Sequence, residues 1–240
     1  MPTFGLYFMA NHKGFRELGP GDNPDPKRYI LVKTKEGSHF RQKRGLVTPA
    51  VLNDTLQKSA DSIKVCSPAA KRIAAVLWQH LRGLETGRSI ARISGLLRKA
   101  LRMNGKLDFS LFGDFEFQPY RPLDALLKAP YECQEKDGRI EVEIPIHKAG
   151  VKRLNPLVTG YYFDLVLLYG DPTKDGGLKV DNVTSSLYLY ESNGGPCILS
   201  ITLPQTGEPW MVMLKISSLE GNELAVHPRH YGMRVVMHSH

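Results

Sequence analysis

The spacing of apolar residues changes from a helical period to an alternating one near the middle of the chain. Between residues 48 and 104, apolar residues recur every three or four positions, as they do on the buried face of an amphipathic helix. From residue 107 onward, apolar and polar residues alternate in short runs, which is typical of strands with one buried face. The pattern predicts an α+β chain, with a mainly helical region over residues 1–106 and a β domain over residues 107–240.

Three helices and one short strand are predicted in the first region. The strand covers Tyr29–Thr34. The pairs Thr48-Pro49 and Ser67-Pro68 each place an N-cap residue before a proline at the first helical position, and the third helix opens near Thr86. Gly105 ends it, because glycine accepts the left-handed conformation of a helix C-cap. The expected buried stripes are Leu52, Leu56, Ala60 and Ile63, then Ile73, Leu77, Leu81 and Leu84, then Ile90, Ile93, Leu97 and Leu101.

Short strands separated by turn signals fill the second region. Residues 139–146 alternate strictly between apolar and other residues, after the turn signal Asp137-Gly138. Residues 161–168 are apolar on both faces apart from Asp164, which predicts a central strand covered on both sides. Further runs are residues 115–118, 187–190, 197–203, 210–216 and 231–237. This pattern, without helices in between, predicts an antiparallel β-sandwich of the immunoglobulin or fibronectin type III kind.

The net charge changes sign near the same place where the spacing of apolar residues changes. The chain of 240 residues has a formal net charge of +8, but residues 1–110 hold 20 Lys and Arg against 8 Asp and Glu, whereas residues 111–240 hold 12 against 16. The net charges of the two halves, +12 and −4, influence which partners the chain can bind and how soluble it is, but they do not indicate its fold. Together with the change of period, they predict a domain boundary within residues 105–113.

Four segments of the first region carry a resemblance to known sequences. They are RYILVKT at residues 28–34, TPAVLN at 48–53, SPAAKRI at 67–73 and GRSIARI at 87–93. Together they resemble a group of uncharacterised bacterial proteins in which a basic helical segment precedes an immunoglobulin-like β-sandwich. The resemblance implies a domain of unknown function and brings no catalytic residue with it.

No arrangement of reactive residues predicts an enzyme. The sequence has neither a nucleophile elbow nor a glycine-rich phosphate loop. Its three cysteines are scattered and in no CxxC pair, and the four histidines near the end (His227, His230, His238 and His240) have no cysteine or carboxylate beside them to complete a metal site. We therefore predict a non-enzymatic chain with no catalytic residue, no cofactor and no metal.

Membrane insertion and secretion are not predicted. No apolar run approaches the ~18 residues that a membrane-spanning helix needs. The apolar start of the chain lacks the preceding Lys or Arg of a secretory signal. A cytoplasmic chain is the default expectation, and export by an unusual route is the alternative.

Basic residues are the candidate binding residues. They lie in and after the first strand and on the third predicted helix: Lys33, Lys35, Arg41, Lys43, Arg44, Arg88, Arg92 and Lys99. The last three fall on one side of a helical wheel. Such a surface can dock on an acidic protein surface, including a second copy of this chain, or contact phosphates of a nucleic acid. The preferred prediction is a binding or assembly protein whose sandwich presents a protein-interaction surface, and the alternative is a nucleic-acid-associated protein.

Overall fold

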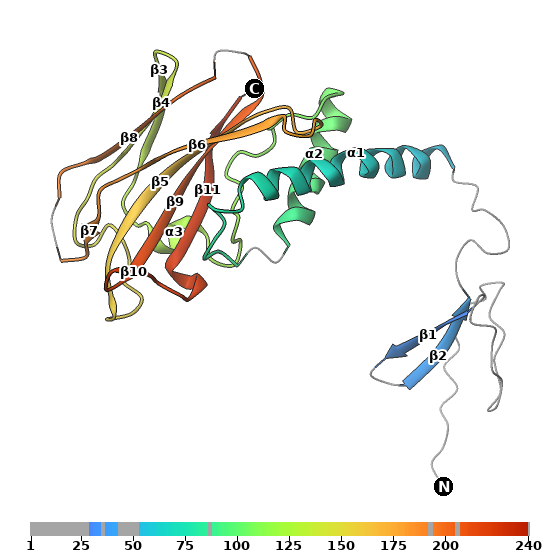
Figure 1. Cartoon of the computed structure of the whole chain (residues 1–240), viewed down its shortest axis with the longest axis horizontal. Helices are drawn as coiled ribbons and strands as arrows, with labels where there is room; N and C mark the ends of the chain where they lie inside the picture. Colours follow the sequence, from blue (N-terminus) through green and yellow to red (C-terminus); the bar gives the residue numbers. More distant parts are fainter. Residues whose placement is uncertain are drawn as a thin grey trace, which may run out of the picture. The chain divides into compact units, whose positions relative to one another are not determined.

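A computed structural model describes residues 29–34, 37–42, 53–85, 88–191, 194–204 and 207–239 (Figure 1). Its internal contacts divide the chain into two compact units, Met1–Leu56 and Gln57–His240. In the first unit, β1 (Tyr29–Thr34) and β2 (Gly37–Gln42) form an antiparallel hairpin. The predicted strand is confirmed, and β2 is a second strand that the sequence did not predict.

Two long helices, α1 (Asp54–Val76) and α2 (Ser89–Asn104), precede the larger sheet in the chain. The predicted start at Thr48 lies outside the described residues, and α1 instead has Asn53 before its first turn, where the side-chain oxygen accepts the N–H of Leu56 at 2.9 Å. The predicted end of α2 is confirmed. Gly105 has a φ of 71° and donates its N–H to the carbonyl of Leu101 at 3.0 Å.

The helix start predicted at Ser67 is wrong, because α1 runs through Pro68 without a break. Proline in a helix interior removes one hydrogen bond and costs ~3 kcal/mol. Fully buried residues nevertheless stand at helical spacing on both sides of it, namely Cys66, Ala69, Ala70 and Ile73. A continuous helix keeps this whole stripe in the core, and that burial opposes the cost of the proline.

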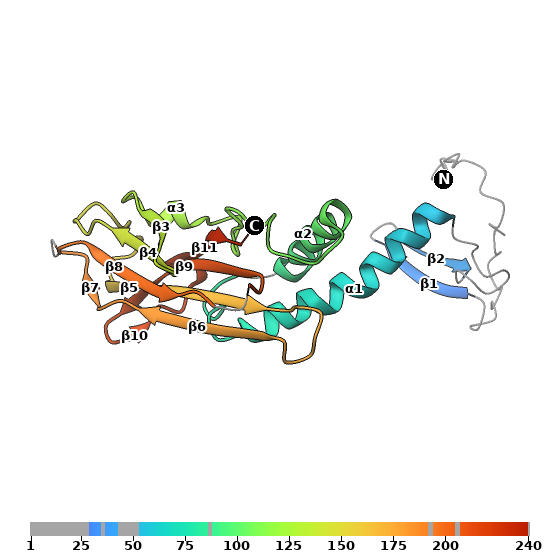
Figure 2. The same cartoon turned by 90° about the horizontal axis from the view of Figure 1, so that it is seen from above.

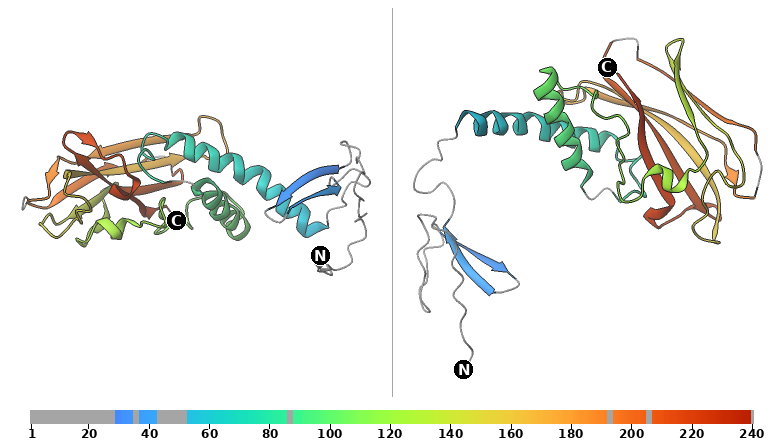
Figure 3. Two further views of the ribbon diagram at one scale, coloured as in Figure 1. Left: turned by 90° about the horizontal axis from the view of Figure 1, so that it is seen from below. Right: turned by 180° about the vertical axis from the view of Figure 1, so that it is seen from behind.

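The second unit contains two antiparallel sheets. The larger has six strands in the order β10-β9-β5-β6, with β11 paired to β9 and β7 to β5, and the smaller has the order β3-β4-β8. The strands are β3 (Glu132–Lys136), β4 (Arg139–Ile144), β5 (Val158–Gly170), β6 (Leu178–Thr184), β7 (Tyr188–Leu189), β8 (Cys197–Thr202), β9 (Trp210–Glu220), β10 (Glu223–Leu224) and β11 (Tyr231–His238). A short helix, α3 (Leu123–Leu126), packs against β11 (Figure 3), and the 3-10 turn η1 (Pro228–His230) precedes that strand.

The chain is therefore mixed α+β with antiparallel sheets, in line with the predicted class. An immunoglobulin or fibronectin type III sandwich is not confirmed. The larger sheet curls into a half-barrel, and only one of its faces is covered by another sheet.

Apolar cores lie on both faces of the larger sheet. On β5, Leu165 and Leu167 pack in a core with β4 and β8, whereas Val166 and Leu168 pack in a second core with α1 and α2. Figure 2 shows β3 and β4 on one side of β9 and the last turns of α1 on the other. The predicted burial of both faces of residues 161–168 is thus confirmed, but a pair of helices covers the second face.

Candidate functional site

The basic residues predicted as a binding set fall in several different environments. Lys33 lies on β1 and Arg41 on β2, where their backbones pair with Ser38 and Ile30. Lys35, Lys43 and Arg44 lie outside the described residues. The structure therefore describes these two strand residues in the first unit and three helix residues, Arg88, Arg92 and Lys99, in the second.

The three residues around α2 do not form one surface. Arg92 is half-buried, donates from Nη1 to the carbonyl of Glu116 at 2.6 Å, and stacks over the ring of Phe115 at 4.4 Å. Lys99 is exposed to solvent. Arg88 is the N-cap residue of α2 and lines a groove between the two long helices. A helical wheel gives the direction of each side chain but not the neighbour that it meets.

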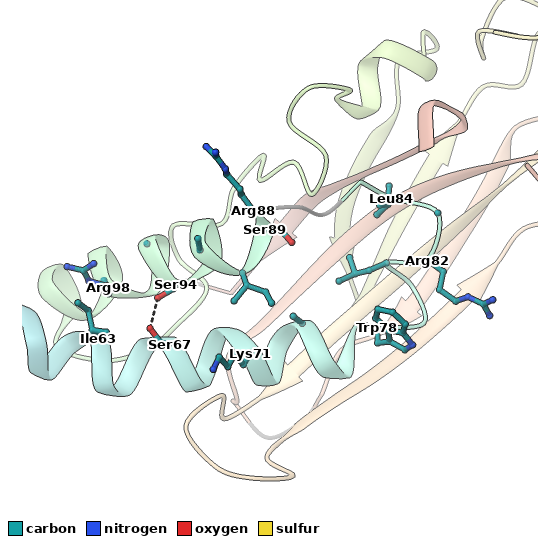
Figure 4. Close-up of a pocket in the computed structure, with 16 residues that line it drawn as sticks. Ile63, Ser67, Lys71, Trp78, Arg82, Leu84, Arg88, Ser89, Ser94 and Arg98 are labelled. Atoms are coloured by element: carbon teal, nitrogen blue, oxygen red, sulfur yellow. Dashed lines mark hydrogen bonds between the residues drawn. The ribbon is translucent and has the colours of Figure 1, made fainter. Parts of the chain in front are cut away.

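This groove, of about 940 Å³, runs between α1, the connecting segment of residues 77–84, and the first half of α2 (Figure 4). Its lining residues are Ile63, Ser67, Lys71, Ala74, Trp78, Leu81, Arg82, Gly83, Leu84, Arg88, Ser89, Ile90, Ala91, Ser94, Gly95 and Arg98. We call it the α1–α2 groove.

Small residues keep the floor of the groove open. Ser67 of α1 and Ser94 of α2 face each other, with their hydroxyl oxygens 3.5 Å apart (Figure 4). Around this contact the lining residues are Ala74, Ala91 and Gly95. A Cβ atom added at Gly95 would meet no atom within 4 Å. The space above these positions is therefore free, although glycine inside a helix costs ~1 kcal/mol relative to alanine.

Large apolar side chains stand exposed along the groove. Ile63 is 44% exposed, Ile90 is 45% exposed and Trp78 is 68% exposed. Ile63 and Ile90 were expected in buried stripes, and that expectation is wrong for both. On α1 the core shared with the sheet begins only at Cys66, and on α2 it contains Ile93 and Leu97 but not Ile90. An exposed apolar groove bordered by polar residues is typical of an interaction site.

The charge around the groove is uniformly positive. Lys71, Arg82, Arg88 and Arg98 line it, and among its described lining residues there is no aspartate or glutamate. The N-terminus of α2, which carries the positive end of the helix dipole, opens onto the same rim, and its first turn contains no acidic residue. The groove therefore favours an occupant that is both apolar and negatively charged.

The connecting segment is held in place by the sheet beneath it. Lys215 on β9 donates from Nζ to the carbonyl of Arg82 at 3.4 Å and lies 5.7 Å from the centre of the Tyr231 ring. Burial lowers the pKa of Lys215, and Asp164, its partner on β5, raises it in part. Gly83, with a φ of 84°, packs so closely on Tyr231 that a side chain there would clash with the ring. These contacts fix the end of the groove that the connecting segment forms.

Other kinds of site find no support in the part of the chain that the structure describes. No group of three or more His, Cys, Asp or Glu side chains is placed to hold a metal ion there. Among the described helices, none is long and apolar enough to cross a lipid bilayer.

No protein-family model matches this sequence, and no curated protein matches it either. The resemblance of residues 28–105 to uncharacterised bacterial proteins stays a hypothesis. The groove and its charges are the basis of the function proposed next.

Proposed function

We propose that this chain is a non-enzymatic binding protein that holds a segment of a protein partner in the α1–α2 groove. The observation that carries the proposal is the combination of exposed apolar side chains with four cationic side chains and no described carboxylate along one groove. Binding sites in proteins are concave, mainly apolar, and contain a few polar groups that orient the ligand. The groove has these properties.

A protein segment fits this surface better than a nucleic acid does. A nucleic acid offers a polyanionic backbone, and single strands also stack their bases on aromatic side chains. Trp78 is the sole aromatic residue among the described lining residues, and the floor of the groove is made of small residues. Apolar side chains of a protein can fill that floor while their acidic neighbours meet the rim.

The proposed binding surface differs from the one that the sequence predicted. The sequence pointed to the β domain, whereas the groove lies on the helices. It retains Arg88 from the predicted binding residues and gives Arg92 a structural role, because Arg92 contacts Glu116 and Phe115.

Site-specific photo-crosslinking tests the proposal with the full chain in cells that produce it. A photo-reactive amino acid replaces Ile90 in the groove, and the same amino acid replaces Lys99 as the control on the exposed side of α2. We expect a defined protein adduct from position 90 that position 99 does not give. The adduct should disappear with Gly95→Trp, because an indole at this open position fills the groove.

Two results would contradict the proposal. Position 90 could give no adduct, or it could give adducts with nucleic acid alone. The second result would favour the alternative in which the basic residues contact phosphates.

A further inference from the structure

We infer that the segment held in the groove is an acidic amphipathic helix of the partner protein, about four turns long. The inference rests on the proposed function and specifies the chemistry of the partner. It comes from the helical spacing of the two walls, the length of the groove and the position of its charges.

Both walls of the groove are faces of helices. The lining residues on the α1 wall are separated by four, four, three and four positions: Ile63, Ser67, Lys71 and Ala74 of α1, and Trp78 two residues beyond its end. Those of α2 include Ala91, Ser94, Gly95 and Arg98, at the same kind of spacing. Ridges and grooves at this spacing on two neighbouring helices accept the ridge of a third helix. The small residues at the floor let its backbone come close.

The length of the groove sets the length of the guest. From Ile63 to the end of α1 at Val76, the helix rises on the order of 20 Å at 1.5 Å per residue. A guest helix of about 14 residues covers this distance. Guests of this kind bind through apolar residues at positions i, i+3, i+4 and i+7, which here would meet Ile63, Ile90 and Trp78.

Cationic groups lie along the whole length of the groove. Arg98 lies at one end and Arg82 at the other, while Lys71 lies between them on α1 (Figure 4). Arg88 adds a fourth charge at the start of α2. A guest helix with glutamate or aspartate on both flanks of its apolar stripe meets a cation on either wall. A basic or neutral helix leaves these charges without anionic partners, and charge complementarity of this kind selects among guests.

Fluorescence anisotropy with designed peptides tests the inference on the full chain. The probe is a labelled peptide of about 18 residues with leucine at i, i+3, i+4 and i+7 and glutamate on its flanks. Three matched peptides replace every glutamate with glutamine, replace every glutamate with lysine, or place one proline at the centre. We expect the acidic peptide to bind, the glutamine and proline peptides to bind about tenfold more weakly, and the lysine peptide not to bind.

Variants of the chain locate the binding. Gly95→Trp should abolish binding of the acidic peptide, and Lys71→Gln combined with Arg88→Gln should weaken it about tenfold. Lys99→Gln removes one positive charge from an exposed position of α2 outside the groove lining and should leave the affinity unchanged. Thermal melting of each variant shows whether the fold is intact.

Several outcomes would overturn the inference. They are equal binding of the acidic and lysine peptides, equal binding of the acidic and proline peptides, and binding that Gly95→Trp does not reduce. Displacement of the peptide by oleate or by duplex DNA, with tighter binding of that competitor, would assign the groove to a lipid or to a nucleic acid. If position 90 crosslinks to a protein but the acidic peptide fails to bind, the proposed function stands and the acidic helix is refuted. If both fail, both are refuted.

Discussion

The imidazole of His230 is the most deeply buried titratable ring near the end of the chain. His230 is 1% exposed, and its Nε2 accepts a hydrogen bond from Nε of Arg229 at 3.2 Å. Burial lowers the pKa of His230, and the neighbouring charges lower it further, apart from one carboxylate that raises it. The charged and titratable groups around the ring are Arg121, His227, Arg229 and Glu220. The folded chain therefore keeps His230 neutral at pH values where a free imidazole already takes up a proton.

This difference makes the stability depend on pH. Below about pH 6.5 the unfolded chain binds a proton at this position that the folded chain does not bind, so the free energy of unfolding falls as the pH falls. We expect the melting temperature to decrease from pH 7 to pH 5. His230→Gln, which keeps an acceptor for Arg229, should make that decrease smaller.

The neighbouring His227 provides a graded comparison for this prediction. It is exposed, and its Nδ1 accepts the N–H of Arg229 at 3.2 Å. His227→Gln removes one of the groups that lower the pKa of His230, so it should reduce the pH dependence of the melting temperature less than His230→Gln does. Part of the dependence should remain in His230→Gln, because burial also lowers the pKa of His80. An unchanged pH profile in His230→Gln would show that the buried ring does not govern the acid response.

At the scale of single elements, α1 departs from a local rule, because it contains a proline, Pro68, in its interior. Proline at an interior helical position cannot donate to the carbonyl four residues earlier, here that of Lys64. The side chain of Pro68 is exposed, so its removal sacrifices little packing. We expect Pro68→Ala to raise the free energy of unfolding by about 1–3 kcal/mol, measured by urea denaturation.

A second proline separates the helix effect from effects on the unfolded chain. Pro130 is exposed and lies outside any helix or strand. Pro130→Ala loosens the unfolded chain in the same way as Pro68→Ala but restores no helical hydrogen bond, so it should lower the stability slightly. A loss of stability in Pro68→Ala would mean that the proline itself helps to place Cys66 and Ile73 in the core.

Elements with a strong local signal are those that the sequence could predict. The turn Asp137-Gly138 predicts a hairpin, and both residues have positive φ, 50° and 71°, between β3 and β4. Gly105 ends α2 as expected. By contrast, β3 itself has four exposed residues out of five, and β6 has few buried residues. Strands with mostly polar sequences carry no clear alternation of their own and are set by pairing with a neighbour, here β4 for β3 and β5 for β6.

The exposure of the groove residues could not be predicted, for a different reason. Its lining comes from three segments, and its apolar members Ile63 and Ile90 have the same helical spacing as core residues. They are exposed because they lie outside the parts of the two helices that pack against the sheet. Within the sequence, the usable signal is the set of small residues Ser67, Ala91, Ser94 and Gly95, which lie on helix faces where a packed core would place larger side chains.

At the scale of the whole molecule, the change of period near residue 106 does not mark the edge of a core. The core between the helices and the larger sheet contains Ile73, Leu77, Ile93 and Leu97 together with sheet residues. It also contains the phenylalanines of the linking segment, Phe109, Phe112, Phe115 and Phe117, which pack ring against ring. The division into compact units falls between Leu56 and Gln57.

Truncation of the chain tests which division describes folding. Residues 107–240 alone would leave a face of the larger sheet without its helices, and that face carries Val166, Leu168, Met211, Met213 and Val235. Each large apolar side chain transferred to water costs about 1.5–3 kcal/mol, and a typical domain has only 5–15 kcal/mol of stability in total. We expect the fragment 107–240 to aggregate or to lack a cooperative melting transition, and the fragment 57–240 to be a monomer that melts cooperatively.

Circular dichroism and light scattering on the two fragments make the comparison. The fragment 57–240 retains both long helices apart from the first turn of α1, so its melting temperature should stay close to that of the full chain. Leu77→Ala in this fragment serves as the internal control: its fully buried side chain should cost about 2–5 kcal/mol if the helices stabilise the sheet. A soluble, cooperatively melting fragment 107–240 would contradict the shared core as the unit of folding. It would support instead the boundary within residues 105–113 that period and charge predict.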